Sequence, residues 1–134
     1  MSFRPKYPKN LEFQVNTEWN GKLGGKVKTE QGYHVEFEIP ELFGGHGKAV
    51  CPDELFAASV AGCLMHTFLH TRERLGLEMK AFSLQTRVNV NFECQRYQIT
   101  KITVGGILTV EEGEEELGEE CLYFAKKYCH ISRS

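Results

Sequence analysis

Long apolar runs and basic runs are both missing from this sequence of 134 residues, and each absence excludes a class of protein. No segment offers the roughly 20 unbroken apolar residues that span a membrane. The formal net charge is −2 and the lysines and arginines are dispersed, which gives no basis for binding nucleic acid or an anionic membrane. The first ten residues lack the apolar core and the cleavage site of a secretory signal, so we expect a cytoplasmic protein.

Metal-binding motifs are also missing. The five cysteines form no CxxC pair and no Cys/His group at zinc-finger spacing. In a reducing compartment they do not indicate a structural disulfide framework either. His66 and His70 are four residues apart, but the glutamate of an HExxH motif does not accompany them. We therefore expect no metal ion and no cofactor.

What the sequence does contain is the composition of an ordinary globular protein, 41% apolar and 25% charged. A chain of this length is typical of one domain, here residues 1–134. Alternating apolar and polar residues predict three early strands joined by tight turns, which is typical of an antiparallel meander. These strands are Leu11–Trp19, a short strand through Val27, and Tyr33–Ile39.

The stretch Pro52–Leu75 is predicted to be the central helix. Pro52 suits the first helical turn, Asp53 and Glu54 complement the positive end of the helix dipole, and Gly76 marks the end. Its first half is apolar on almost every side, so it needs cover from the rest of the fold or from a partner chain. We therefore expect an intertwined homodimer that buries this long helix.

Two long alternating strands follow, Met79–Phe92 and Tyr97–Val110. The acidic run Glu111–Glu120 opens a last helix whose apolar positions recur at helical spacing: Leu117, Cys121, Phe124, Ala125 and Tyr128. The expected order is βββ-α-ββ-α, an α+β domain with a mainly antiparallel sheet of five or six strands.

A buried free cysteine is usually a small hydrophobic residue without a chemical role. That interpretation suits Cys121, which falls on the packing stripe of the last helix. Cys63 and Cys129 differ in context. Cys63 lies among small residues in the central helix, and Cys129 lies at the end of the last helix.

The stretch CPDELFAASVAGC, from Cys51 to Cys63, resembles the P-E-x-L-x-x-A-x-x-A-x-C helix of the OsmC/Ohr family, the osmotically inducible and organic hydroperoxide resistance proteins. Cys129-His130-Ile131-Ser132 is similar to the second-cysteine motif of that family, C-P-x-S. Trp19-Asn20-Gly21, the glycine-rich turn after it and the element order extend the resemblance from about Val15 to Ser132.

The resemblance implies a thiol peroxidase of the OsmC-like subgroup that works without metal or flavin. Cys63 would be the peroxidatic cysteine and Cys129 the resolving one. The Cys63 thiolate would attack an organic hydroperoxide, the resulting sulfenic acid would condense with Cys129 to a disulfide, and an external dithiol, lipoyl-type in some members, would reduce that disulfide.

Members of the family assist the reactive cysteine with a loop arginine and a glutamate of the helix motif. The matching acid here is Asp53, with Glu54 adjacent, whereas the matching loop offers Lys22 and Lys26 but no arginine. His66, three residues after Cys63, shares its helical face and is a further candidate for stabilising the thiolate.

Two other functions remain open. The same scaffold could be a dimeric domain that binds a small ligand, with its thiols retained for packing. It could also be a redox sensor that uses the same disulfide as a signal, and the sequence does not separate that role from the peroxidase.

Overall fold

A computed structural model describes residues 8–131, which form two compact units that divide between Pro52 and Asp53. The structure is α+β with antiparallel sheets and two α-helices, as expected. The grouping of both units into one domain stays a prediction. Ser132, where the motif similarity ends, lies outside the described residues.

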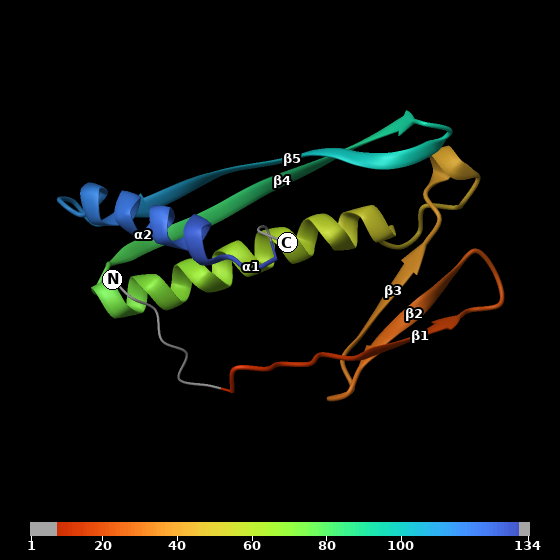
Figure 1. The fold of residues 1–134 in the computed structure, drawn as a ribbon, viewed down its shortest axis with the longest axis horizontal. Coiled ribbons are helices and arrows are strands. Elements are labelled where there is room, and N and C mark those ends of the chain that lie inside the picture. The colour runs from red at the N-terminus through yellow and green to blue at the C-terminus, as the bar shows by residue number, and fades with distance from the viewer. Residues whose placement is uncertain (1–7, 132–134) are drawn as a thin grey trace. The chain divides into compact units, whose positions relative to one another are not determined.

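The first unit is an antiparallel meander of β1 (Val15–Trp19), β2 (Gly24–Thr29) and β3 (His34–Glu38), with β2 in the middle (Figure 1). A short 3-10 turn, η1 (Glu41–Phe43), follows. The predicted meander is confirmed, but β1 is shorter than the predicted strand because residues 11–14 do not pair.

Alternation of apolar and polar residues predicts that the first strand is half-buried, and for a single chain this prediction is wrong. Every residue of β1 is exposed, and Trp19 keeps 76% of its surface in water. The described part of this unit contains one sheet and one 3-10 turn, which leaves no second layer to bury the apolar face.

Helix α1 (Pro52–Leu75) opens the second unit and has the predicted bounds. Its end is a Schellman motif: Gly76 adopts φ +73°, and the N–H of Leu77 donates to the carbonyl of Arg72 at 3.0 Å. In one chain α1 buries only four residues, Val60, Cys63, Phe68 and Thr71. The apolar residues Phe56 and Leu69 remain exposed.

Strands β4 (Met79–Glu93) and β5 (Arg96–Val110) form a long antiparallel hairpin. Its two turn residues, Cys94 and Gln95, both have positive φ, as a type I′ turn requires. The hairpin is a sheet of its own, so the single sheet of five or six strands was the wrong expectation. Alternation along a strand indicates which of its faces is apolar, but it does not indicate which strands pair with one another.

Helix α2 (Glu115–Tyr128) starts within the acidic run, and it lies with α1 on one face of the hairpin (Figure 1). The buried core of the second unit joins both helices and the segment between α1 and β4. It consists of Phe68, Leu77, Cys121 and Ala125. The rings of Phe68 and Phe82 pack with centroids 4.4 Å apart, so that α1 packs directly on β4. The packing stripe predicted for the last helix is thus confirmed at its centre.

Candidate functional site

Cys63 lies in the middle of α1 and is 8% exposed. One turn later, the hydroxyl of Thr67 donates a hydrogen bond to the carbonyl oxygen of Cys63 at 2.9 Å. The same hydroxyl interacts with the Cys63 thiol. Residues four apart on a helix are neighbours, so α1 itself supplies a polar group to an otherwise apolar surrounding.

The end of α2 brings the second cysteine to this thiol. The backbone N–H of Cys129 still donates to the carbonyl of Ala125 at 3.0 Å, but Cys129 itself has extended backbone angles and ends the helix. The chain therefore turns toward α1, and the Cys129 side chain is fully buried. The Cys129 thiol hydrogen-bonds to Cys63, and both cysteines are in the reduced form.

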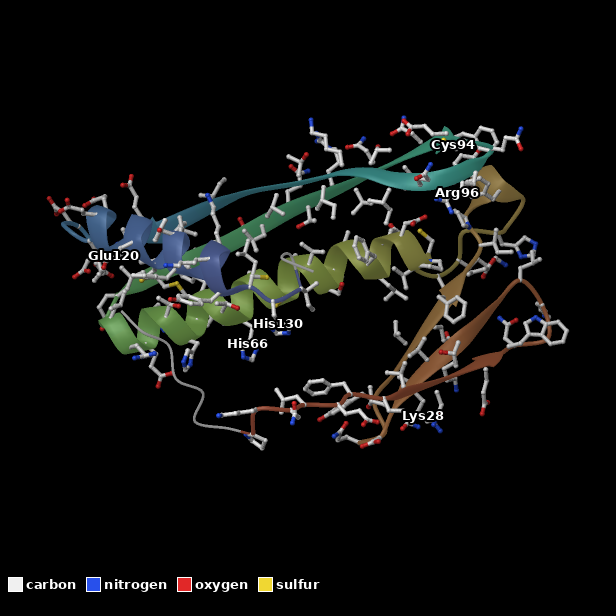
Figure 2. All side chains as sticks on the ribbon, viewed as in Figure 1. Lys28, His66, Cys94, Arg96, Glu120 and His130 are labelled. Atoms are coloured by element: carbon white, nitrogen blue, oxygen red, sulfur yellow. The ribbon has the colours of Figure 1, made fainter. Side chains whose placement is uncertain are left out.

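The two residues after Cys129 also face Cys63. Nδ1 of His130 lies 3.8 Å from Sγ of Cys63, and the backbone N–H of Ile131 hydrogen-bonds to the same sulfur. Figure 2 shows His130 and His66, which come from different elements. Sequence reasoning placed His130 in the second-cysteine motif without a role, and it did not consider Thr67 or Ile131.

The surroundings of Cys63 act on its acidity in opposite directions. Burial raises the pKa of the Cys63 thiol above its ordinary value, and Cys129 raises it further through its hydrogen bond and its charge. The Ile131 N–H lowers the pKa because it donates to the thiolate. The Thr67 hydroxyl, which donates to the Cys63 carbonyl, lowers it as well, because its single proton can turn toward the charged sulfur. The net result is a raised pKa for the Cys63 thiol, which favours its protonated form.

The acidic candidates lie at the start of the helix, away from Cys63. Asp53 and Glu54 are exposed in the first turn of α1. Asp53 is ten residues before Cys63, which corresponds to about 15 Å along a helix axis. Within one chain, α1 therefore does not bring Asp53 to the Cys63 thiol.

The lysine candidates belong to the first unit. Lys22 lies in the turn before β2, where its backbone N–H donates to Asn20 Oδ1 at 2.8 Å and its carbonyl accepts from the Trp19 indole at 2.9 Å. Lys26 lies within β2, paired in register with Glu18 and Glu36. Both lysines are exposed.

His66 is exposed on α1 and lines a shallow surface hollow with Leu69, His70 and Glu73. Among the described residues, the histidine in contact with the Cys63 thiol is His130. Within residues 8–131, no group of three or more His, Cys, Asp or Glu residues is arranged to hold a metal ion. None of the helices in that range is both long and apolar enough to cross a bilayer.

A cavity of about 310 Å³ lies between α1, the hairpin and α2, next to the site. Val60 and Leu64 of α1 line it from one side, and Phe82, Leu84 and Leu108 line it from the hairpin. Lys126 of α2 is its one charged lining residue among those described. Cys63 lies between Val60 and Leu64 in sequence but does not line the cavity.

Three solved structures show where this fold occurs. An OsmC-like protein of unknown function from Vibrio cholerae superposes with a TM-score of 0.81 at 14% identity, over 92% of this chain and 93% of that one. An organic hydroperoxide resistance protein from Elizabethkingia anophelis gives 0.73 at 18% identity, over 94% and 89%. An organic hydroperoxide resistance protein OsmC from Legionella pneumophila gives 0.66 at 20% identity, over 97% and 90%.

No curated protein sequence matches the chain. The family model described as OsmC-like protein matches residues 45–134, which include Cys63, Cys129 and the neighbours of Cys63 described above. The chain belongs to the OsmC-like family.

Proposed function

We propose that the protein is a thiol-dependent peroxidase that reduces organic hydroperoxides and protects against oxidative stress. The observation that carries this proposal is the contact between Cys63 and Cys129, two reduced thiols from different elements. Family membership and the fold shared with organic hydroperoxide resistance proteins support it.

The reaction needs three steps. The thiolate sulfur of Cys63 attacks the terminal oxygen of ROOH; the O–O bond breaks, and the alkoxide takes a proton and leaves as ROH. Cys63 is then a sulfenic acid, oxidised by two electrons. The Cys129 sulfur displaces its hydroxyl, which leaves as water, and a Cys63–Cys129 disulfide forms.

An external dithiol closes the cycle by thiol–disulfide exchange, and a lipoyl-type dithiol is the first candidate. It becomes a disulfide itself and returns both cysteines to the reduced form. Apolar walls beside α1 suit an alkyl or aryl hydroperoxide better than hydrogen peroxide, because they favour an apolar R group.

Two features support a homodimer as the working form. Large apolar side chains on β1 and on the hairpin are exposed in the single chain, among them Trp19, Phe92 and Ile107. In addition, about 15 Å along α1 separate Asp53 from Cys63, so Asp53 does not reach that thiol in its own chain. We infer that Asp53, with Glu54, Lys22 and Lys26 in support, acts on the site of the other protomer.

The test is a titration with one equivalent of cumene hydroperoxide, followed by intact mass and peptide mapping. The expected product has lost two hydrogens and carries a Cys63–Cys129 link, and the Cys63→Ser variant gives no link and no turnover with dithiothreitol. The Cys121→Ser variant is the matched control, since Cys121 is also buried but lies in the core. Turnover retained in Cys63→Ser would refute the proposal.

A second function is favoured by the cavity. Its apolar lining with a single cation suits an apolar ligand that carries an anionic group, and the raised pKa of Cys63 suits a thiol kept for packing. On this alternative the protein binds a small ligand and the cysteines stay reduced. No mass change with cumene hydroperoxide, even in excess, would favour it.

A further inference from the structure

The thiol of Cys63 requires a proton acceptor before it can react with any electrophile. The thiolate is the nucleophile, and burial and the neighbouring Cys129 disfavour it. The two groups that favour the thiolate, the Ile131 N–H and the Thr67 hydroxyl, are hydrogen-bond donors. They stabilise the anion once it exists, but neither is a base at neutral pH.

His130 is the base within reach. Its Nδ1 lies 3.8 Å from Sγ of Cys63, a distance at which a thiol can donate to an imidazole nitrogen. The imidazole is exposed while the thiol is buried, so a proton taken from the thiol can exchange with water through the ring. Histidine commonly acts in this way, because its imidazole ring can accept a proton from one group and release it to another.

The local backbone explains why His130 faces α1. Cys129 leaves the helical path with φ −71° and ψ 103°, and the hydrogen bond from the Ile131 N–H to Cys63 fixes the chain on the far side of His130. The imidazole is thus attached between two residues that both contact the thiol.

His66 is the competing histidine. It is three residues after Cys63 and exposed, and it lines the surface hollow with Leu69, His70 and Glu73. The titratable group that acts on Cys63 besides His130 is Cys129, from the end of α2, and His66 is not among the residues that act on this thiol.

We propose that His130 is a catalytic residue that accepts the proton of Cys63 and afterwards donates it to the leaving oxygen. In the first step the S–H bond of Cys63 breaks and a proton binds to Nδ1, which yields a thiolate beside an imidazolium. In the second step sulfur bonds to the terminal oxygen of ROOH, the O–O bond breaks, and RO⁻ takes the imidazolium proton and leaves as ROH. The first step, proton transfer from Cys63 to His130, does not require the proposed peroxidase function. The second step, reaction with the hydroperoxide, rests on it.

The experiment for the first step uses iodoacetamide and no peroxide. The rate at which Cys63 is alkylated is followed by peptide mapping between pH 5 and 9 in the full chain and in single variants. His130→Gln is expected to slow the alkylation of Cys63 by roughly 100-fold at neutral pH, which is the lower end of the range for general base catalysis. It is also expected to change the pH dependence of the alkylation rate, because the proton acceptor of Cys63 is gone.

Matched controls separate chemistry from folding. His70→Gln, on the same helix but two turns from Cys63, is expected to leave the alkylation of Cys63 unchanged, and the exposed Cys94 peptide in every sample monitors the reagent. His130→Asn keeps a hydrogen-bonding amide near the position of Nδ1 but binds no proton. It is expected to be as slow as His130→Gln.

Three results would overturn the assignment. These are an unchanged pH profile in His130→Gln, a wild-type rate in His130→Asn, and a loss of rate in His66→Gln in place of His130→Gln. If alkylation depends on His130 while cumene hydroperoxide leaves the chain unchanged, the peroxidase proposal fails and the role of His130 as base stands.

Discussion

Thr67 stands one helical turn after Cys63, and its hydroxyl donates to the Cys63 carbonyl at 2.9 Å while also interacting with the Cys63 thiol. A helix interior seldom needs a side-chain donor of this kind, because its carbonyls already accept from the backbone four residues on. The bond instead keeps the single hydroxyl proton of Thr67 beside the sulfur, toward which it can turn when the thiolate forms. It holds a donor next to a thiolate that burial disfavours.

Thr67→Val keeps the shape of the side chain and removes that donor. The pKa of Cys63 is expected to rise further, and its alkylation by iodoacetamide to slow about fivefold at neutral pH, the equivalent of a hydrogen bond of about 1 kcal/mol. Thr71→Val is the control, since Thr71 makes the same kind of bond to Thr67 at 2.8 Å one turn further on. If both variants slow the alkylation of Cys63 equally, the effect comes from a change in the helix and not from the loss of a donor to the thiol.

The stability of the fold is expected to fall in alkaline solution. Burial raises the pKa of Cys63 and of Cys121 in the folded state, so both thiols hold their protons more tightly there than in the unfolded chain. Their contribution is complete below the ordinary thiol value of about 8.5 and is lost as the pH rises through the raised values. Urea unfolding from pH 7 to 10, with reductant present, measures the decline.

Cys121→Ser should flatten that decline, whatever its effect on stability at pH 7, because one of the two titrating thiols is gone. Cys94→Ser should not change it, since Cys94 is exposed at the hairpin turn. A slope that is the same in all three proteins would assign the pH dependence to other groups.

The core of the second unit depends on Phe68. This side chain is fully buried and packs on Phe82, so Phe68→Ala should lower the free energy of unfolding by about 3–5 kcal/mol. Phe68→Leu should recover more than half of that loss, because it leaves a smaller cavity. Thermal melts and urea titrations followed by circular dichroism provide the values. A loss below about 1 kcal/mol in Phe68→Ala would contradict the packing described.

Gly25 lies where neighbouring strands of the first unit approach each other closely. A Cβ there would lie 2.9 Å from Cζ of Phe37 and closer still to the carbonyl oxygen of Glu18. Gly25→Ala should therefore destabilise the meander by about 1–3 kcal/mol, as overpacking does. Gly105→Ala, in a strand position with open space around it, is the control expected to be milder.

The chain should sediment at twice its 15.3 kDa mass at micromolar concentration, because Trp19, Phe92 and other large apolar side chains are exposed in one chain. Analytical ultracentrifugation in the presence of reductant measures this directly. A monomer would remove the expected dimer and with it the role proposed for Asp53.

The helices and the hairpin were predictable to within a few residues because their signals are local. Pro52 and Gly76 bound α1, and alternation with polar turn residues bounds β4 and β5. The division into two sheets was not predictable, since pairing between distant strands depends on the whole fold. The same holds for the site: the motif similarity pointed to Cys63 and Cys129, but it did not reveal their neighbours. Only the path of the chain after Tyr128 shows that His130 and Ile131 reach the same sulfur.

The hairpin turn has a practical consequence for work on this protein in air. Cys94, at the hairpin turn (Figure 2), is the exposed thiol among the five cysteines. Cys63, Cys121 and Cys129 are buried. Storage without reductant would join two molecules tip to tip through Cys94, giving a band of double mass on a non-reducing gel. Such a band would indicate oxidation of Cys94 during storage. It would not indicate the native oligomeric state or the redox state of Cys63. A Cys94→Ser background removes this artefact and leaves the reactive site unchanged.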